Sequence, residues 1–148
     1  MIELGKIIGS EAKPGDVFGL IGDLGAGKTH FTKGFVLGNN CENPVTSPTF
    51  SLIHEYEGGS CYIFHFDLYR LENASELLEI GWEDYLEMDG ICVVEWADKF
   101  PELMPRNIQW LKIKLLDDET RLITEAVSYT HLRAHETRHD LVCRLLLE

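Results

Sequence analysis

The chain has 148 residues, a formal net charge of −12 and an apolar fraction of 45%. This length suits one globular domain, and no run of about 18 apolar residues indicates a membrane span. An overall charge this acidic disfavours binding of nucleic acid across the whole surface, although the chain could still act on RNA through a basic partner. The four cysteines form no Cys-x-x-Cys pair, which argues against a zinc site or a disulfide framework. With no secretory signal at its start, we expect a reduced, cytoplasmic protein.

Hydrophobic periodicity predicts alternating helices and strands along residues 1–126. The first helix occupies residues 1–10, where Leu4, Ile7 and Ile8 recur at helical spacing. The other predicted elements, in chain order, are strand Val17–Ile21, helix 30–37, strands 50–56 and 61–66 joined by a hairpin turn, a helix capped by Asn73 or Ser75 and interrupted at Gly81, and strands 91–94, 111–115 and 121–124.

One glycine-rich segment joins the first predicted strand to the helix after it. It fits the pattern of a phosphate-binding loop, Gly-x-x-x-x-Gly-Lys-Thr, in the strand–loop–helix context that the motif requires. Glycines let the backbone aim its N–H groups inward, and the helix adds its positive end. Lys28 would place a charge on the β/γ-phosphates, and Thr29 would offer a hydroxyl to Mg²⁺. The predicted nucleotide contacts are Asp23, Leu24, Gly25, Ala26, Gly27, Lys28, Thr29 and His30.

Two carboxylates, Asp67 and Glu95, stand at the ends of apolar strands. In open α/β sheets, ligands bind outside the carboxyl ends of the strands, and a phosphate loop needs acids that hold Mg²⁺ and orient water. We therefore expect both to face solvent and nucleotide as catalytic and metal-binding residues, with Lys28 as the third catalytic residue. His65 lies two residues before Asp67 and on the same side of the strand. A catalytic role and ordinary packing in the sheet suit His65 equally.

These segments together resemble the TsaE family, formerly YjeE, the small bacterial ATPases of threonylcarbamoyladenosine tRNA modification. The resemblance covers roughly Leu4 to Thr124 and is specific because the segments share the family's order and spacing. The matching stretches are Lys13-Pro14-Gly15-Asp16-Val17, the phosphate loop, Ser47-Pro48-Thr49-Phe50, His65-Phe66-Asp67-Leu68-Tyr69-Arg70-Leu71 and Glu95-Trp96.

The resemblance implies a P-loop NTPase fold, a three-layer α/β sandwich whose mostly parallel central sheet carries an antiparallel hairpin. It implies binding of ATP and Mg²⁺, slow hydrolysis by the chain alone, and work with a TsaB–TsaD pair in which TsaD modifies the tRNA. Thr29 and Glu95 would hold Mg²⁺, and Asp67 would assist the metal or the attacking water. Residues 47–50 would sense the nucleotide, although a plain Ser/Thr turn suits them equally, and Trp96 would contribute to activity.

Two departures from the family pattern concern the ends of the chain. Met1 lies close to the first matched residues, which predicts the loss of a segment near the adenine. The tail 127–148 is formally neutral, so the whole charge lies in the predicted ATPase domain, residues 1–126. The tail resembles translated vector or adaptor sequence, and we expect a helix or a loose end there. His131, His135 and His139 recur every four residues but lack a fourth ligand, which disfavours a metal site.

Three other functions compete with this interpretation. A small-molecule kinase uses the same loop but normally needs an Arg-rich lid, and the stretch between Lys33 and Lys112 offers only Arg70 and Arg106. A GTPase-type switch would need an Asn-Lys-x-Asp element, which the sequence lacks. A nucleotide-binding scaffold without turnover stays open, because a sequence does not reveal a rate.

Overall fold

A computed structural model describes residues 1–23, 25–41, 45, 51–57, 59, 61–117, 120–126 and 141–146, the last range as backbone only. Within these residues, no helix is long and apolar enough to cross a membrane.

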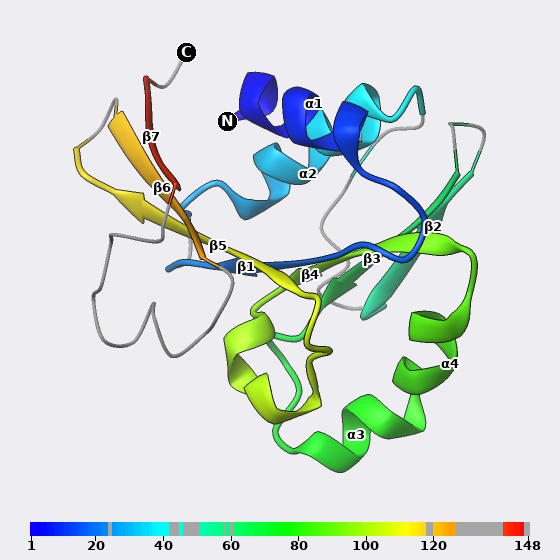
Figure 1. Cartoon of the computed structure of the whole chain (residues 1–148). Helices are drawn as coiled ribbons and strands as arrows, with labels where there is room; N and C mark the ends of the chain where they lie inside the picture. The colour runs from blue at the N-terminus through cyan, green and yellow to red at the C-terminus, as the bar shows by residue number, and fades with distance from the viewer. Residues whose placement is uncertain are drawn as a thin grey trace.

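The fold is built on a seven-stranded sheet with the order β2-β3-β4-β1-β5-β6-β7 (Figure 1). Its four central strands are parallel: β3 (Tyr62–Asp67), β4 (Gly90–Glu95), β1 (Val17–Ile21) and β5 (Gln109–Leu115). Antiparallel strands extend both edges: β2 (Ile53–Tyr56) beside β3, and β6 (Thr120–Ala126) and β7 (Leu141–Leu146) beyond β5. The predicted parallel centre and the β2–β3 hairpin are confirmed, and β6 and β7 add a second antiparallel extension.

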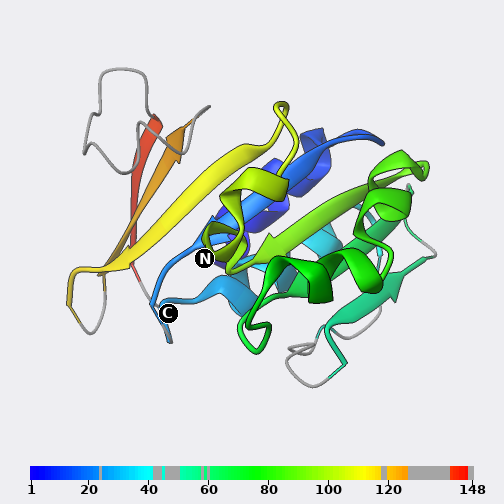
Figure 2. The same ribbon diagram turned by 90° about the horizontal axis from the view of Figure 1, so that it is seen from below.

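Helices cover both faces of the sheet, which confirms the three-layer sandwich. On one face lie α1 (Ile2–Glu11) and α2 (Lys28–Gly38). On the other lie α3 (Ala74–Glu79), α4 (Trp82–Glu87) and the two 3₁₀ turns Ala97–Lys99 and Pro101–Leu103 (Figure 2). Side chains alternate along each strand, so each face of the sheet contributes residues to its own hydrophobic core. Phe18, Val93 and Ile113 pack toward α2, whereas Val17, Phe66 and Val94 pack toward α4.

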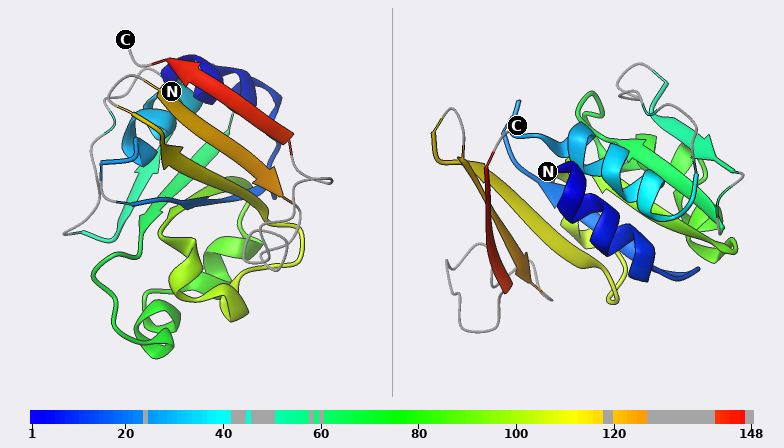
Figure 3. Two further views of the ribbon diagram at one scale, coloured as in Figure 1. Left: turned by 90° about the vertical axis from the view of Figure 1, so that its left-hand side faces the viewer. Right: turned by 90° about the horizontal axis from the view of Figure 1, so that it is seen from above.

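Glycines make the contact between α1 and α2, which lie side by side (Figure 3, right). A Cβ added at Gly5 or Gly9 would lie 2.3 Å from the carbonyl oxygen of Phe31 or 2.2 Å from that of Phe35. The glycines of α2 approach α1 equally closely, since a Cβ at Gly34 would lie 2.0 Å from the Ile2 carbonyl oxygen. The sequence prediction of α1 is confirmed, but Ile7, expected on its apolar face, is 57% exposed.

Most predicted strand and helix positions are confirmed, and two differences have clear causes. Of the predicted strand 50–56, residue 50 lies outside the described part and β2 begins only at Ile53, because Leu52 turns with φ 69°. The helix prediction for the tail is wrong at Leu141–Leu146, which forms β7 because its backbone pairs with β6. The three tail histidines lie outside the described residues.

Candidate active site

The phosphate loop runs from the end of β1 to the start of α2, as the motif requires. Gly25 and Gly27 take the left-handed angles φ 79° and 108°, which side-chain-bearing residues rarely adopt. Gly27 caps α2, so the first N–H groups of that helix have no intrahelical partner. A Cβ at Gly22 would lie 2.6 Å from the carbonyl oxygen of Ile113, so the loop approaches β5 closely. The result is a turn whose N–H groups suit an anion.

Lys28 is buried and bonds back onto the loop. Its Nζ donates to the carbonyl oxygens of Gly22 at 2.6 Å and Asp23 at 2.9 Å. The same atom lies 4.2 Å from the centre of the Trp96 ring. Burial lowers the pKa of the Lys28 ammonium, although the carboxylates of Glu95 and Asp67 oppose that shift. Lys28 is therefore positioned by loop carbonyls and by an aromatic face.

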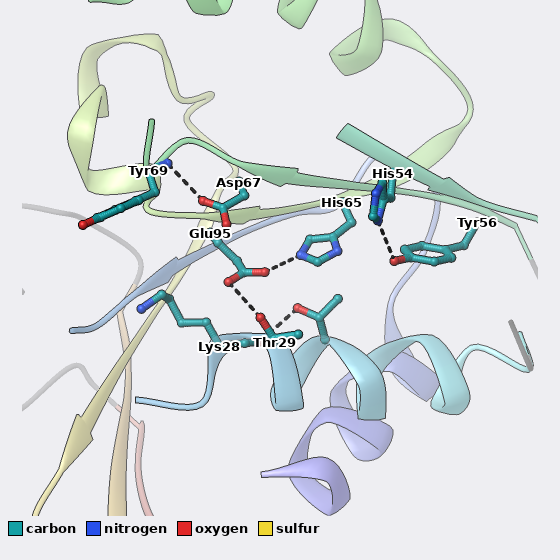
Figure 4. Close-up of polar contacts among 9 residues, drawn as sticks. Lys28, Thr29, His54, Tyr56, His65, Asp67, Tyr69 and Glu95 are labelled. Carbon is teal, nitrogen blue, oxygen red and sulfur yellow. Dashed lines mark hydrogen bonds and ion pairs between the residues drawn. The ribbon is translucent and has the colours of Figure 1, made fainter. Parts of the chain in front are cut away.

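Glu95, at the end of β4, connects the loop helix to β3 (Figure 4). One carboxylate oxygen accepts a hydrogen bond from the Thr29 hydroxyl at 3.4 Å, and the other accepts one from Nε2 of His65. Side chains alternate along each strand, and the pairing of β3 with β4 puts His65 and Glu95 on the face that α2 covers. This is why the two side chains come into contact. Nδ1 of His65 is buried without a hydrogen-bond partner within the described structure, so the proton is assigned to Nε2.

Asp67 is the neighbour of Glu95 in the parallel pairing of β3 with β4. Its carboxylate accepts a hydrogen bond of 3.0 Å from the Tyr69 N–H. The expectation that both acids face solvent is wrong, since each is only 3% exposed. Tyr69 follows two residues after Asp67 and Trp96 directly after Glu95, and both line the same cavity as the acids. Both acids still line the cavity above the loop.

Trp96 makes a sharp turn directly after Glu95. Its φ of 61° is unusual for a bulky residue and is typical of strained functional sites. Its ring packs 5.0 Å from that of Tyr69, and it lines two cavities. The first is the cavity above the loop, of about 350 Å³. The second, of about 580 Å³, also borders Asp98 and Lys112.

The structure brings most of the predicted site residues together. The first cavity is lined by Gly25, Gly27, Lys28, Thr29, His30, Asp67, Glu95 and Trp96, all of them predicted, and also by Tyr69 and Arg121. Asp23 and Ala26 border the second cavity instead. Leu24 and residues 47–50 lie outside the described residues.

Arg121 is the site residue that the sequence analysis missed. It lies on β6, far along the chain from the motif, and no local pattern marks it. Its Nε donates to the Ala26 carbonyl oxygen, and its Nη2 donates to that of Gly25 at 3.1 Å. The signal that could have identified Arg121 is the short spacing between the predicted strands 111–115 and 121–124. A hairpin of these two strands places Arg121 near the end of the first one.

The residues present fit a magnesium nucleotide. Mg²⁺ prefers oxygen ligands and usually takes one or two carboxylates, with phosphates and waters completing its shell. Thr29, Glu95 and Asp67 supply such oxygens beside the anion-binding turn. In the described part of the chain, no three His, Cys, Asp or Glu side chains form a complete metal cage. The protein would therefore contribute a partial shell that a bound phosphate chain completes.

Comparisons with known proteins identify the family of this chain. A sequence model of the family described as "Threonylcarbamoyl adenosine biosynthesis protein TsaE" matches residues 1–123. A Bacillus subtilis (strain 168) protein, "tRNA threonylcarbamoyladenosine biosynthesis protein TsaE", is 44% identical over 140 residues, 93% of this chain and 87% of that protein. Its namesake from Haemophilus influenzae is 40% identical over 113 residues, covering 76% of this chain and 70% of that protein.

A solved structure shows the same architecture. The crystal structure of Bacillus subtilis YdiB matches with a TM-score of 0.69 and 38% identity, over 93% of this chain and 87% of that one. The P-loop fold that the resemblance implied is therefore confirmed. Because the family match spans the loop and both strand-end acids, the chain belongs to the TsaE family.

Proposed function

We propose that this chain binds ATP with Mg²⁺ at the phosphate loop and hydrolyses it slowly. The observation that carries the proposal is the contact of Glu95 with Thr29, at 3.4 Å, which brings a strand-end carboxylate to the start of the loop helix. In this position Thr29 and Glu95 would hold the metal. When bound, Mg²⁺ would neutralise charge that develops on the phosphate oxygens.

The chain's own residues then have separable tasks. The loop N–H groups and Lys28 bind the phosphates and orient them. His65 holds one oxygen of Glu95, which leaves the other directed at Thr29. Asp67, the partner of Glu95 in the strand pairing, assists the metal or orients the attacking water. Trp96 and Tyr69 line the same cavity as the acids and limit the access of bulk water.

The biological task that we propose is support of threonylcarbamoyladenosine formation on tRNA, together with TsaB and TsaD. Its support is membership of the family and the names of the similar proteins. The net charge of −12 agrees with a chain that reaches tRNA indirectly, with the partner pair holding the RNA. The proposed cycle of ATP binding and hydrolysis would allow repeated turnover of that complex.

Replacement of Lys28 tests nucleotide binding. Lys28→Ala removes the one cation of the loop segment and should weaken ATP binding at least about a hundredfold, since a buried charge-assisted contact is lost. Lys33→Ala, one turn further along α2, is the matched control and should bind like the parent. Isothermal titration calorimetry with Mg²⁺ and ATP measures both. Unchanged affinity in Lys28→Ala would overturn the assignment of the site.

Partner dependence tests the biological task. Phosphate release and tRNA modification are measured with the chain alone, with TsaB–TsaD alone and with all three. We expect a low rate from the chain alone and a rise in both products when the three are mixed. Rapid phosphoryl transfer to a small metabolite without the partners would instead support the small-molecule kinase.

A further inference from the structure

Arg121 reaches the phosphate loop from a strand at the edge of the sheet. It pairs with Leu115, the last residue of β5, and because β6 runs antiparallel to β5 its beginning lies where β5 ends. Figure 3 shows β6 and β7 continuing the sheet past β5. The Arg121 residue is only 8% exposed, and two of its nitrogens donate to the Gly25 and Ala26 carbonyl oxygens.

The third nitrogen of the guanidinium is not satisfied. Nη1 is buried and, within the described structure, has no hydrogen-bond partner. A guanidinium stays charged in proteins, yet no carboxylate of the described residues forms an ion pair with it. Burying a charged donor without a partner is unfavourable, so Nη1 is a donor that an anionic ligand would satisfy.

The surroundings identify the kind of anion. Arg121 lines the same cavity as Gly27, Lys28 and Thr29. Its Nε lies 3.1 Å from where a Cβ of Gly27 would stand, next to the N-terminus of α2. The positive end of a helix repels a lone cation. An anion bound between the helix N–H groups and the guanidinium would be attracted by both, and it would offset the repulsion between them.

Lys28 and Arg121 also act on the loop in the same way. Lys28 donates to the carbonyl oxygens of Gly22 and Asp23, and Arg121 donates to those of Gly25 and Ala26. Two cations thus hold carbonyl groups at the beginning and at the tip of the loop. The Ala26 N–H donates to the Asp23 carbonyl oxygen at 3.0 Å. The carbonyls held by Lys28 and Arg121 do not point into the anion-binding turn as competing acceptors.

We propose that Arg121 is a second phosphate-binding cation of this site. Nε and Nη2 hold the loop carbonyls, and Nη1 donates to an oxygen of the phosphate chain of a bound nucleoside di- or triphosphate. This inference rests on the proposed function, since it specifies how the same site binds its nucleotide.

Two substitutions separate phosphate binding from simple support of the loop. Arg121→Gln keeps an N–H donor for the carbonyls but removes the charge, and Arg121→Lys keeps the charge but loses the planar fork. The matched control is Arg106→Gln, an exposed arginine at the opposite end of β5. Calorimetry of the full chain with ADP and with ATP plus Mg²⁺ measures affinity independently of hydrolysis.

We expect Arg121→Gln to weaken the binding of both nucleotides at least about tenfold, as the loss of one charge-assisted hydrogen bond predicts. Arg121→Lys should lose less affinity, about threefold. If Arg121→Gln does not fold, the affinity of Arg121→Lys is the result that tests the proposal. The difference between Arg121→Gln and the parent should shrink from about 0.05 M to about 0.5 M salt, because screening weakens a charge contact. Arg106→Gln should bind like the parent.

Three results would overturn the assignment of Arg121 while leaving ATP binding intact. These are parental affinity in both Arg121 variants, equal losses in the two variants, or a loss that does not change with salt. The last two would indicate a support for the loop that never touches phosphate. A parent chain that binds no ATP would overturn the proposed function, and this assignment with it.

Discussion

The orientation of the Glu95 carboxylate is set separately at each of its two oxygens. Its two carboxylate oxygens have different partners, the Thr29 hydroxyl and the His65 ring. A second residue that holds one ligand oxygen fixes the direction of the other, as second-shell partners do in metal sites. Each acid is only 3% exposed, so few water molecules have direct access to its carboxylate.

The strand-end acids should be needed for turnover rather than for folding. We expect Glu95→Gln and Asp67→Asn to melt within a few degrees of the parent, since each amide keeps an acceptor for the existing N–H donors. Their rate of ATP hydrolysis with the partner proteins should fall by about a hundredfold or more. Phosphate release measures the rate, and Glu102→Gln, an exposed acid, is the control. A parental rate in either variant would remove that residue from the mechanism.

Asp98 is a half-buried acid near the site. Burial raises the pKa of its carboxyl above 3.8, although the positive charges of Lys28 and Lys112 act against the shift. The folded state therefore binds this proton more tightly than the unfolded chain does, so ionisation of Asp98 lowers stability as the pH rises. We expect Asp98→Asn to raise the melting temperature by a few degrees near neutral pH.

The pH dependence of that gain is the sharper part of the test. The difference in melting temperature between Asp98→Asn and the parent should shrink as the pH falls and vanish below 3.8, where the carboxyl is neutral in both states. Differential scanning calorimetry without nucleotide measures it, with Glu102→Gln as the control. A gain that is constant with pH would mean that the charge of Asp98 is not its cause.

At the scale of elements, the contact of α1 with α2 fixes the helix that carries the phosphate loop. Small residues every four positions, Gly5 and Gly9 on one helix and Gly34 and Gly38 on the other, let the two backbones approach. Asn39, at the end of α2, adds a hydrogen bond of 3.2 Å to the Gly9 carbonyl oxygen. The position of α2, and with it that of Lys28 and Thr29, therefore depends on residues without side chains.

Gly9→Ala should reveal this dependence. Alanine alone would favour a helix by about 1 kcal/mol, but the added Cβ would lie 2.2 Å from the carbonyl oxygen of Phe35, a backbone atom that cannot rotate away. We expect a net loss of about 1–3 kcal/mol in the free energy of unfolding, measured by urea denaturation. The exposed neighbour Ser10→Ala should change it by less than about 0.5 kcal/mol. A stabilised Gly9→Ala would show that the two helices are not in close contact.

At the scale of the whole molecule, the candidate active site lies where the carboxyl ends of β1, β3 and β4 meet the start of α2. The β5–β6 extension adds Arg121 from one side of the loop. The backbone of β7 pairs only with the outer edge of β6, away from the central strands. The domain of residues 1–126 stays a prediction, and β7 from the tail belongs to the same sheet.

Shortening the chain tests that boundary. A chain that ends at Ala126 keeps the pairing of β6 with β5, from Trp110–Ala126 to Leu115–Arg121, and so keeps Arg121 at the loop. We expect its ATP affinity, measured by calorimetry, to stay within about twofold of the full chain, even if loss of β7 lowers its melting temperature. Zn²⁺ added to the full chain should not raise the melting temperature. A loss of nucleotide affinity on shortening would make the tail part of the site.

The sequence by itself determined the features that depend on neighbours along the chain. A phosphate loop is a local structure, so its glycines, Lys28 and Thr29 could be identified from spacing alone. The continuous apolar runs before Asp67 and Glu95 likewise placed both acids at strand ends, and alternation placed His65 on the same side of its strand as Asp67.

Only the tertiary structure decided what these residues touch. The pairing of β3 with β4 makes Asp67 and Glu95 neighbours, Trp96 lines the same cavity as both acids, and the pairing of β6 with β5 brings Arg121 to Gly25. Periodicity reports which face of an element is apolar, but it carries no information on which element lies next to it. Strand order and helix contacts arise from burial shared between distant segments, and the partners of Glu95 and the position of Arg121 follow from them.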